Sequence, residues 1–306
     1  MNHGYVIKTD ALTKRYGVLE AVHALNLRVE GHGITGFLGR NGAGKSSTLR
    51  MLLGMIRPTS GTGTVLGNRI DDVSASLQMR RRIAYVGEDK QMYGYMSVEQ
   101  TIRFTRSFYT DWNEAAAQRL LKQYELPLGR KVRALSKGMR TKLALLLALS
   151  RRPELMILDE PSEGLDPVAI EELLQALIGA TADGVAVFFS SHQIAEVERV
   201  ADRVCIIDRG RLKVDVSMDQ MRQDYRHVTM GFSTSPPPVT FRSAGIAQVV
   251  TAGREIRALV SHDVDDVVAQ AHGLGAVSIE VSPITLRELF LETVGISKSA
   301  VDMQDA

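Results

Sequence analysis

Residues 39–46 read GRNGAGKS and match the phosphate-binding pattern G-x-x-x-x-G-K-S in full. Glycines there let backbone N–H groups curl around phosphate oxygens, while Lys45 reaches the β and γ phosphates and the Ser46 hydroxyl binds Mg²⁺. A chance glycine-rich turn is the alternative, but a strand pattern precedes the loop and a helical pattern follows it, as the chemistry requires. The candidate nucleotide-binding residues of this segment are Gly39, Arg40, Asn41, Gly42, Ala43, Gly44, Lys45, Ser46 and Ser47.

Two adjacent carboxylates end the apolar run LMILDEP at residues 155–161. A strand that delivers both to its carboxyl end can serve one metal ion and one water. Asp159 would hold hydrated Mg²⁺, and Glu160 would polarise the attacking water as general base. A solvated strand end is the alternative, and the position downstream of a phosphate loop favours the catalytic interpretation.

A histidine ends another apolar run, FFSSH at residues 188–192. A lone histidine at a strand end is more often structural. Beside a phosphate loop and two carboxylates, His192 can instead contact the γ-phosphate and fix the position of the water.

A second helix start with an anion-binding profile occurs at residues 134–150, ALSKGMRTKLALLLALS. A serine, a glycine and two basic residues precede a nearly unbroken apolar run. The positive end of a helix macrodipole and its free N–H groups favour an anion at such a start. The chain therefore carries two candidate anion-binding helix starts.

Five ordered motifs resemble those of the nucleotide-binding subunit of ABC transporters over roughly residues 5–215. They are the phosphate loop at 39–46, LSKGM at 135–139, LMILDEP at 155–161, SEGLD at 162–166 and SSH at 190–192. The resemblance implies an ATPase that needs ATP and Mg²⁺, dimerises around ATP and drives a separate transmembrane permease. It further implies that Tyr16 stacks on adenine, and that Ser136 and Gly138 contact the ATP held by the other subunit.

Two departures from the family pattern matter. The family signature is commonly Leu-Ser-Gly-Gly-Gln, whereas here Lys137 and Met139 take its third and fifth places, which puts a sugar contact in doubt. The family usually places a glutamine where this chain has Glu88. A carboxylate can also bind Mg²⁺, so Glu88 is a candidate metal ligand, with a solvated side chain as the alternative. The cluster QMYGYMS that follows is either a docking surface for a partner or packing of a helical insert.

The narrower resemblance is to bacterial export-type systems, including the acetoin-utilisation type subgroup, on the signature, the GED loop and the ending PITLRELFLETVG. The fold class expected is α/β, a P-loop NTPase core of the ABC type with antiparallel β and helical subdomains. The core would span residues 1–216, with the helical insert at about 90–152. A small C-terminal α+β accessory domain would span residues 217–306.

Several local details are expected within these units. Asp111 and Glu114 would form a capping box at the start of a helix, and Thr285 and Glu288 another. Cys205 would lie in a buried strand. His262, Asp263, Asp265 and Asp266 read as a solvated helix start rather than as a metal site.

The composition is typical of a globular protein with a small net charge. Hydrophobic residues make up 44%, charged residues 24%, and the net charge is +2, so no nucleic-acid partner is expected. Apolar runs fall short of the roughly 20 residues that a membrane-spanning helix needs. No signal-peptide design is visible, so the subunit is expected in the cytoplasm, on the cytoplasmic face of the membrane through its permease.

Two rival functions remain open. One is a soluble ATPase of the same type that acts on ribosomes or DNA, although a single set of motifs and the short spacing between them favour the transporter. The other is a nucleotide-dependent regulator with little turnover. The expected dimer consists of two identical chains or of two related ones.

Overall fold

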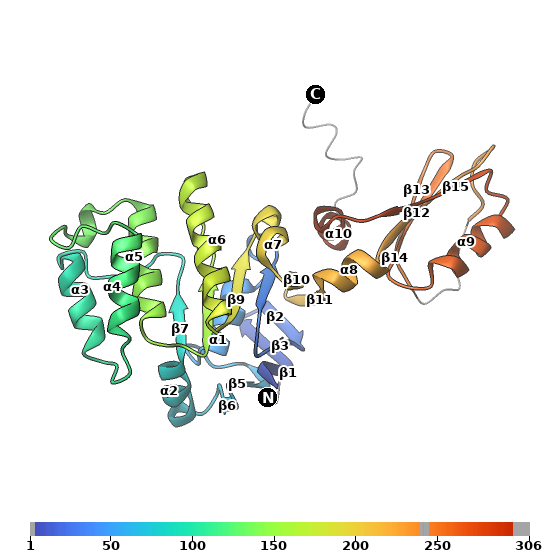
Figure 1. The fold of residues 1–306 in the computed structure, drawn as a ribbon. Helices are drawn as coiled ribbons and strands as arrows, with labels where there is room; N and C mark the ends of the chain where they lie inside the picture. Colours follow the sequence, from blue (N-terminus) through green and yellow to red (C-terminus); the bar gives the residue numbers. More distant parts are fainter. Residues whose placement is uncertain (1–3, 239–240, 242–244, 296–306) are drawn as a thin grey trace. The chain divides into compact units, whose positions relative to one another are not determined.

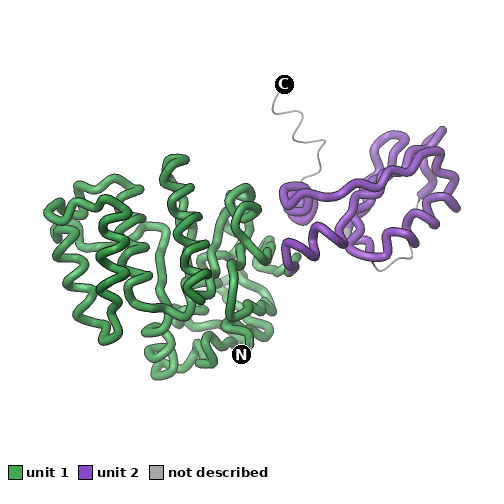
Figure 2. Tube along the Cα trace, in the orientation of Figure 1, with its two compact units in different colours: residues 1–215 green, residues 216–306 purple. Residues whose placement is uncertain are grey.

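The structure is a computed structural model that describes residues 4–238, 241 and 245–295. The chain divides into two compact units, Met1–Asp215 and Val216–Ala306 (Figure 2). Within the described residues, no helix combines the length and the apolar character needed to cross a membrane. The ends of the expected domains at residues 1–3 and 296–306 lie outside the described residues.

A six-stranded sheet forms the centre of the first unit (Figure 1). In spatial order its strands are β11 (Arg211–Ser217), β10 (Arg203–Asp208), β4 (Ile34–Leu38), β9 (Ala186–Ser191), β8 (Leu155–Asp159) and β7 (Ile83–Val86). From β10 to β7 every neighbouring pair is parallel. Strands β4, β8 and β9 are buried along their whole length, as their continuous apolar sequences require in a parallel sheet. Cys205 is fully buried in β10.

The register brings the carboxyl ends of three strands together. Leu38 pairs with Ser191, and Asp159 pairs with Ser190, so β4, β9 and β8 end side by side. The loops that follow these strands therefore emerge at one edge of the sheet, where α/β proteins bind ligands. The helices after these three strands are α1 (Lys45–Leu52), α6 (Pro167–Ala182) and α7 (Ile194–Val200).

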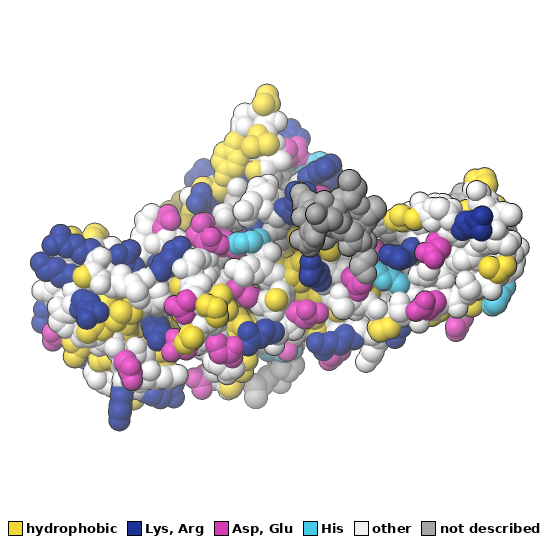
Figure 3. All heavy atoms as spheres, turned by 90° about the horizontal axis from the view of Figure 1, so that it is seen from above, with side chains coloured by type: hydrophobic (Ala, Val, Ile, Leu, Met, Phe, Trp, Pro, Cys, Tyr) yellow, Lys and Arg dark blue, Asp and Glu magenta, His cyan; other side chains and the backbone are white. Residues whose placement is uncertain are grey.

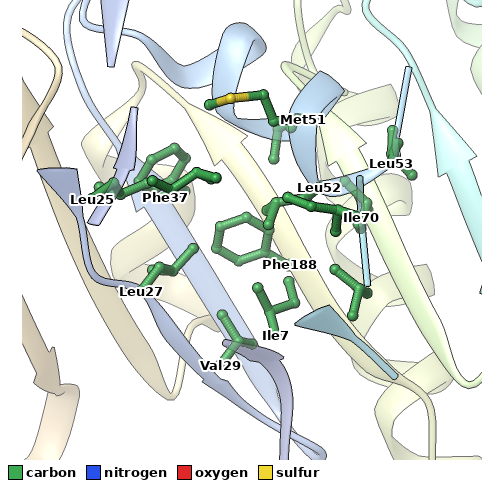
Figure 4. Packing of buried hydrophobic residues seen from close by; sticks show 14 of the residues in the cluster. Ile7, Leu25, Leu27, Val29, Phe37, Met51, Leu52, Leu53, Ile70 and Phe188 are labelled. Carbon is green, nitrogen blue, oxygen red and sulfur yellow. The ribbon is translucent and has the colours of Figure 1, made fainter. Parts of the chain in front are cut away.

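An antiparallel sheet packs on the other side of α1. It contains β2 (Leu19–Leu25), β1 (Tyr5–Tyr16), β5 (Ser60–Val65) and β6 (Asn68–Arg69) in that order, with β3 (Arg28–Glu30) also paired to β1. Helix α2 (Val73–Arg82) follows β6. Side chains of both sheets and of α1 meet in one buried cluster that includes Ile7, Phe37, Met51 and Phe188 (Figure 4). The phosphate loop is thus anchored on a packed core.

Helices fill the segment between β7 and β8. They are α3 (Val98–Arg106), α4 (Glu114–Gln123), a short 3₁₀ turn at Val132–Ala134 and α5 (Lys137–Leu149). The expected Asp111 cap is wrong: Asn113 caps α4, and its side chain accepts a hydrogen bond from the Ala116 N–H at 3.1 Å. The Asn113 N–H donates to the Ser150 carbonyl at 2.7 Å, and this long-range bond fixes where the helix begins.

The second unit is an antiparallel sheet in the order β13 (Ile246–Ala252), β14 (Glu255–Val260), β12 (Arg226–Gly231) and β15 (Ser278–Pro283). Its helices are α8 (Met218–Asp224), α9 (Val264–Gly273) and α10 (Leu286–Thr293). Val228, Met230 and Ile256 of the sheet pack with Val267 of α9 in a separate core. Two hydrophobic cores therefore underlie the two units.

The structure contains both helix starts predicted in the second unit. The capping box of Thr285 and Glu288 is present at α10. Asp265 and Asp266 lie in the first turn of α9. Among the described residues, no group of three or more His, Cys, Asp or Glu side chains is placed to hold a metal ion.

Candidate active site

The loop at residues 39–44 joins β4 to α1, and close packing fixes its shape. A Cβ on Gly39 would lie 2.7 Å from the Ile207 carbonyl oxygen, and a Cβ on Gly44 would overlap the Ala21 carbonyl. Gly44 also has φ 106°, a conformation that glycine adopts at little cost. Gly42, at φ 79°, meets no atom within 4 Å of such a Cβ. The loop is therefore fixed against the protein on one side and open at Gly42.

Lys45, the first residue of α1, is buried and 6% exposed. Its Nζ donates to the Gly39 carbonyl at 2.6 Å and lies 2.9 Å from Glu160 Oε1. A buried cation is stable only with such partners. The ammonium that is predicted to reach phosphate thus also neutralises the predicted general base.

Asp159 ends β8 and is 3% exposed. Its Oδ1 accepts hydrogen bonds from Ser46 Oγ at 3.2 Å and from Ser190 Oγ at 2.7 Å. Hydroxyl and carboxylate oxygens are the ligand types that Mg²⁺ prefers, so Ser46 and Asp159 together fit the ion. Ser190 also accepts from the Glu160 N–H at 3.0 Å, which ties the two carboxylate-bearing residues to β9.

Glu160 and His192 are in direct contact. His192 Nδ1 lies 2.9 Å from Glu160 Oε2, and the His192 N–H donates to the same oxygen at 3.2 Å. Glu160 has φ 45°, an uncommon backbone conformation for a residue other than glycine. Such strain is kept only where the surroundings hold it, and it gathers at functional sites.

Two contacts of the site are not evident from the sequence. Glu163 Oε2 lies 3.7 Å from His192 Nε2, so a carboxylate faces each nitrogen of the imidazole. Ser190 joins Asp159 to the Glu160 backbone. The SEGLD and SSH segments contain both residues, but only the adjacency of β8 and β9 shows what they touch.

A buried carboxylate lies behind these contacts. Glu196 Oε2 accepts hydrogen bonds from Ser162 Oγ at 2.6 Å and from Ser191 Oγ at 3.3 Å. Burial raises the pKa of Glu196, because desolvation disfavours the charged form. The two serine bonds tie Glu196 of α7 to the loop after β8 and to the end of β9.

Glu88 follows β7 and is exposed. It lines a pocket of about 520 Å³ together with Asp159, Arg50 and Met92. The predicted metal ligand therefore shares a pocket with Asp159.

The aromatic residues near this pocket lie at the surface. Tyr95, Tyr93, Phe104 and Phe108 form, in that order, a chain of rings with successive centroids 5.7, 5.6 and 5.0 Å apart. Their exposed fractions run from 40% to 67%. We call these four residues the aromatic surface. In Figure 3 hydrophobic side chains appear among interspersed acidic and basic ones on the first unit.

The remaining predicted site residues lie outside the Lys45 and Glu160 cluster. Tyr16 ends β1, is 45% exposed, and has Lys14 Nζ 5.2 Å from its ring centroid. Ser136 caps α5, and its Oγ accepts from the Met139 N–H at 3.2 Å. A Cβ on Gly138 would lie 3.3 Å from Ala169 Cβ. In the described part of the chain, the hydrogen bonds found for Ser136 stay within α5.

Comparisons with known proteins found a matching family and similar sequences. Residues 22–163 match the sequence model of the family described as ABC transporter. The chain is 35% identical over 224 residues to the bacitracin transport ATP-binding protein BcrA of Bacillus licheniformis, an alignment that covers 72% of each protein. It is 29% identical to the uncharacterized ABC transporter ATP-binding protein YhaQ of Bacillus subtilis (strain 168), over 95% of this chain and 99% of that one.

The fold is also found in solved structures. A structure of the ATP binding subunit of an ABC transporter aligns with a TM-score of 0.64 and 30% identity, over 71% of this chain and 92% of that chain. The predicted fold class is confirmed by this likeness.

Proposed function

The chain belongs to the ABC transporter family as an ATP-binding and ATP-hydrolysing subunit, and from that premise we propose how its residues divide the reaction. One observation carries the proposal: Lys45 Nζ lies 2.9 Å from Glu160 Oε1, and Glu160 Oε2 lies 2.9 Å from His192 Nδ1. The phosphate-binding cation, the base and the positioning histidine form one connected cluster.

Glu160 is the general base in this proposal. Lys45 and the backbone N–H groups of residues 39–44 bind the phosphates of ATP. When phosphate oxygens draw Lys45 away, Glu160 loses its cation and becomes a stronger acceptor for a proton of water. His192 holds the other carboxylate oxygen, so it keeps Glu160 oriented during that exchange.

Ser46 and Asp159 would hold Mg²⁺, with Glu88 as a further ligand from across the pocket. When bound, the ion neutralises negative charge that develops on the phosphates. Ser190 keeps Asp159 in place by donating to its Oδ1 at 2.7 Å. Tyr16, exposed at the end of β1, is available to stack on adenine.

The working unit is proposed to be a dimer around ATP. Ser136 and Gly138 stand at the start of α5, away from the phosphate loop's own contacts, so a second chain would supply the phosphate that they bind. The aromatic surface is proposed to receive a transmembrane permease at the cytoplasmic face, since exposed aromatic residues are enriched at interfaces. We propose export as the direction, on the resemblance to export-type subunits, and an accessory role for residues 217–306.

Glu160→Gln tests the assignment of the base. Glutamine keeps the size of the side chain but cannot take a proton, so ATP hydrolysis should fall at least about 100-fold. ATP should stay bound and hold the chain as a dimer in gel filtration with Mg²⁺. The exposed Glu99 of α3 offers the control Glu99→Gln, which should hydrolyse ATP like the unchanged chain. Unchanged turnover in Glu160→Gln would remove Glu160 from the mechanism.

Purification from detergent-solubilised membranes tests the partner. A polytopic protein that co-purifies with the chain, and that is lost when the four aromatic residues are changed to serine, would support the proposed permease contact. Recovery of ribosomes or DNA in its place would overturn it.

A further inference from the structure

Lys137 departs from the family pattern, and its side chain lies along the loop after β8. A Cβ on Gly164 would overlap the Lys137 ammonium and would lie 3.0 Å from Cε and 3.1 Å from Cδ. Gly164 has φ +66°, in the left-handed region. The absence of a side chain at Gly164 is therefore what leaves room for Lys137.

The loop that Lys137 contacts carries a residue of the active site. Glu163 precedes Gly164, and its Oε2 lies 3.7 Å from His192 Nε2. The loop is closed on itself by a hydrogen bond from the Leu165 N–H to the Ser162 carbonyl at 3.0 Å. A displacement at Gly164 would therefore shift the Glu163 carboxylate relative to His192.

A second contact joins the same two regions. Gly138, next to Lys137, packs against Ala169 near the start of α6, where a Cβ on Gly138 would lie 3.3 Å from Ala169 Cβ. Asp166 caps α6 by accepting from the Ala169 N–H at 2.9 Å. The start of α5 is therefore packed against both the loop after β8 and the first turn of α6.

The charges around Lys137 support this arrangement. Lys90 is buried, and its pKa is lowered by desolvation and next by the charge of Lys137, while Glu163 acts in the opposite direction. Lys137, Lys90 and Glu163 thus share one electrostatic neighbourhood, although Lys137 begins α5 and the other two lie in separate loops.

We propose that Lys137 is a positioning residue for ATP hydrolysis. Lying over Gly164, it holds Glu163 against His192. The position of His192, and through it that of the base Glu160, then depends on the start of α5. The inference rests on the proposed function of Glu160 and His192. It assigns Lys137 a role within its own chain, in contrast to direct binding of a nucleotide on a second chain.

A double-mutant cycle tests the contact, with kcat and the KM for ATP measured on the full chain. Lys137→Ala removes the exposed side chain, and Gly164→Ala displaces it while the lysine is kept. Each change should lower kcat about threefold to tenfold and leave KM within about twofold. The double variant should be no slower than the slower single variant, because both changes break the same contact.

Gly184→Ala is the matched control for backbone strain. Gly184 has φ +86°, and a Cβ there meets no atom within 4 Å, so this variant measures the cost of the left-handed conformation alone. Its kcat should equal that of the unchanged chain. Additive losses in the double variant, or a kcat of Gly164→Ala equal to that of Gly184→Ala, would overturn the proposal.

A rise in KM without loss of kcat in Lys137→Ala would also overturn it and would indicate direct contact with ATP. Failure of the proposed function gives a different result. In that case Glu160→Gln would hydrolyse ATP as fast as the unchanged chain, whatever the outcome of the cycle.

Discussion

Helices α1 and α5 begin alike. Each has a small N-cap residue followed by a lysine, Gly44 and Lys45 at α1 and Ser136 and Lys137 at α5, but the surroundings of the two helix starts differ. At α1 the N-cap is Gly44, Lys45 is buried, and the Ser46 hydroxyl donates a hydrogen bond to Asp159 at the end of β8. At α5 the N-cap Ser136 and the following Lys137 are exposed, and the Ser136 hydroxyl bonds to its own helix. One start is built into the sheet edge, and the other lies at the surface.

The difference shows what a helix N-terminus needs to become a catalytic site. Both starts offer free N–H groups and a positive dipole end. At α1 the buried Lys45 and the Ser46 hydroxyl also meet the carboxylates of Asp159 and Glu160, and the Ser190 hydroxyl of β9 holds Asp159. The start of α5 can contribute N–H groups and the Ser136 hydroxyl, so in the proposed dimer it completes a site that the other chain has already built.

The largest expected effect comes from breaking the start of α1. Lys45→Ala removes the buried cation, so hydrolysis should fall at least about 100-fold, and the affinity of the chain for ATP should fall as well. It also leaves Glu160 buried without its cation, which lowers stability. Phosphate release and equilibrium ATP binding measure the first two effects. The exposed Lys122 gives the control Lys122→Ala, and equal losses in both variants would contradict the role of Lys45.

Breaking the start of α5 should have a smaller and more selective effect. Ser136→Ala removes the cap and the hydroxyl, so hydrolysis should fall about tenfold while ATP binding to the single chain is unchanged. Ser97 caps α3 in the same helical region, so Ser97→Ala should cost similar stability without loss of hydrolysis. A loss of ATP affinity in Ser136→Ala would make the two helix starts alike and would contradict the comparison.

The smallest expected effect is on stability, and it comes from the buried carboxylate of Glu196 near the active site. Burial raises the pKa of Glu196, so the folded chain binds a proton that the unfolded chain releases above about pH 4.5. Stability should therefore fall as the pH rises from that value through the raised pKa. Glu196→Gln keeps an acceptor for Ser162 and removes the ionisable group.

Urea unfolding at several pH values measures this. The variant should gain stability relative to the unchanged chain as the pH rises, by at most about 1.5 kcal/mol. The control Glu198→Gln removes a carboxylate from the same helix, and its pH trend is subtracted from that of Glu196→Gln. If the stability gain of Glu196→Gln grew as the pH fell, the pKa of Glu196 would not be raised in the folded chain.

Prediction from the sequence works best where function needs consecutive residues. The pattern GRNGAGKS contains the glycines, the lysine and the serine, and the structure places them in a strand, a loop and a helix in that order. The cap of α4 could not be found in the same way. Asp111 and Asn113 are both suitable caps by type, and the bond from Asn113 to Ser150 selects one of them.

The residues with the required chemistry could be identified from the sequence: a phosphate loop, two carboxylates, a histidine and a second helix start. Their motifs are local, because backbone conformation and helix capping depend on neighbouring residues. Which of these groups come into contact follows from the way the strands and helices pack. Ser46 and Asp159 are 113 residues apart in the chain. The register of β8 and β9 places Ser190 beside Asp159, and the loop after β8 brings Glu163 to His192. Contacts at such separations depend on the order of strands in the sheet, which side-chain chemistry alone does not specify.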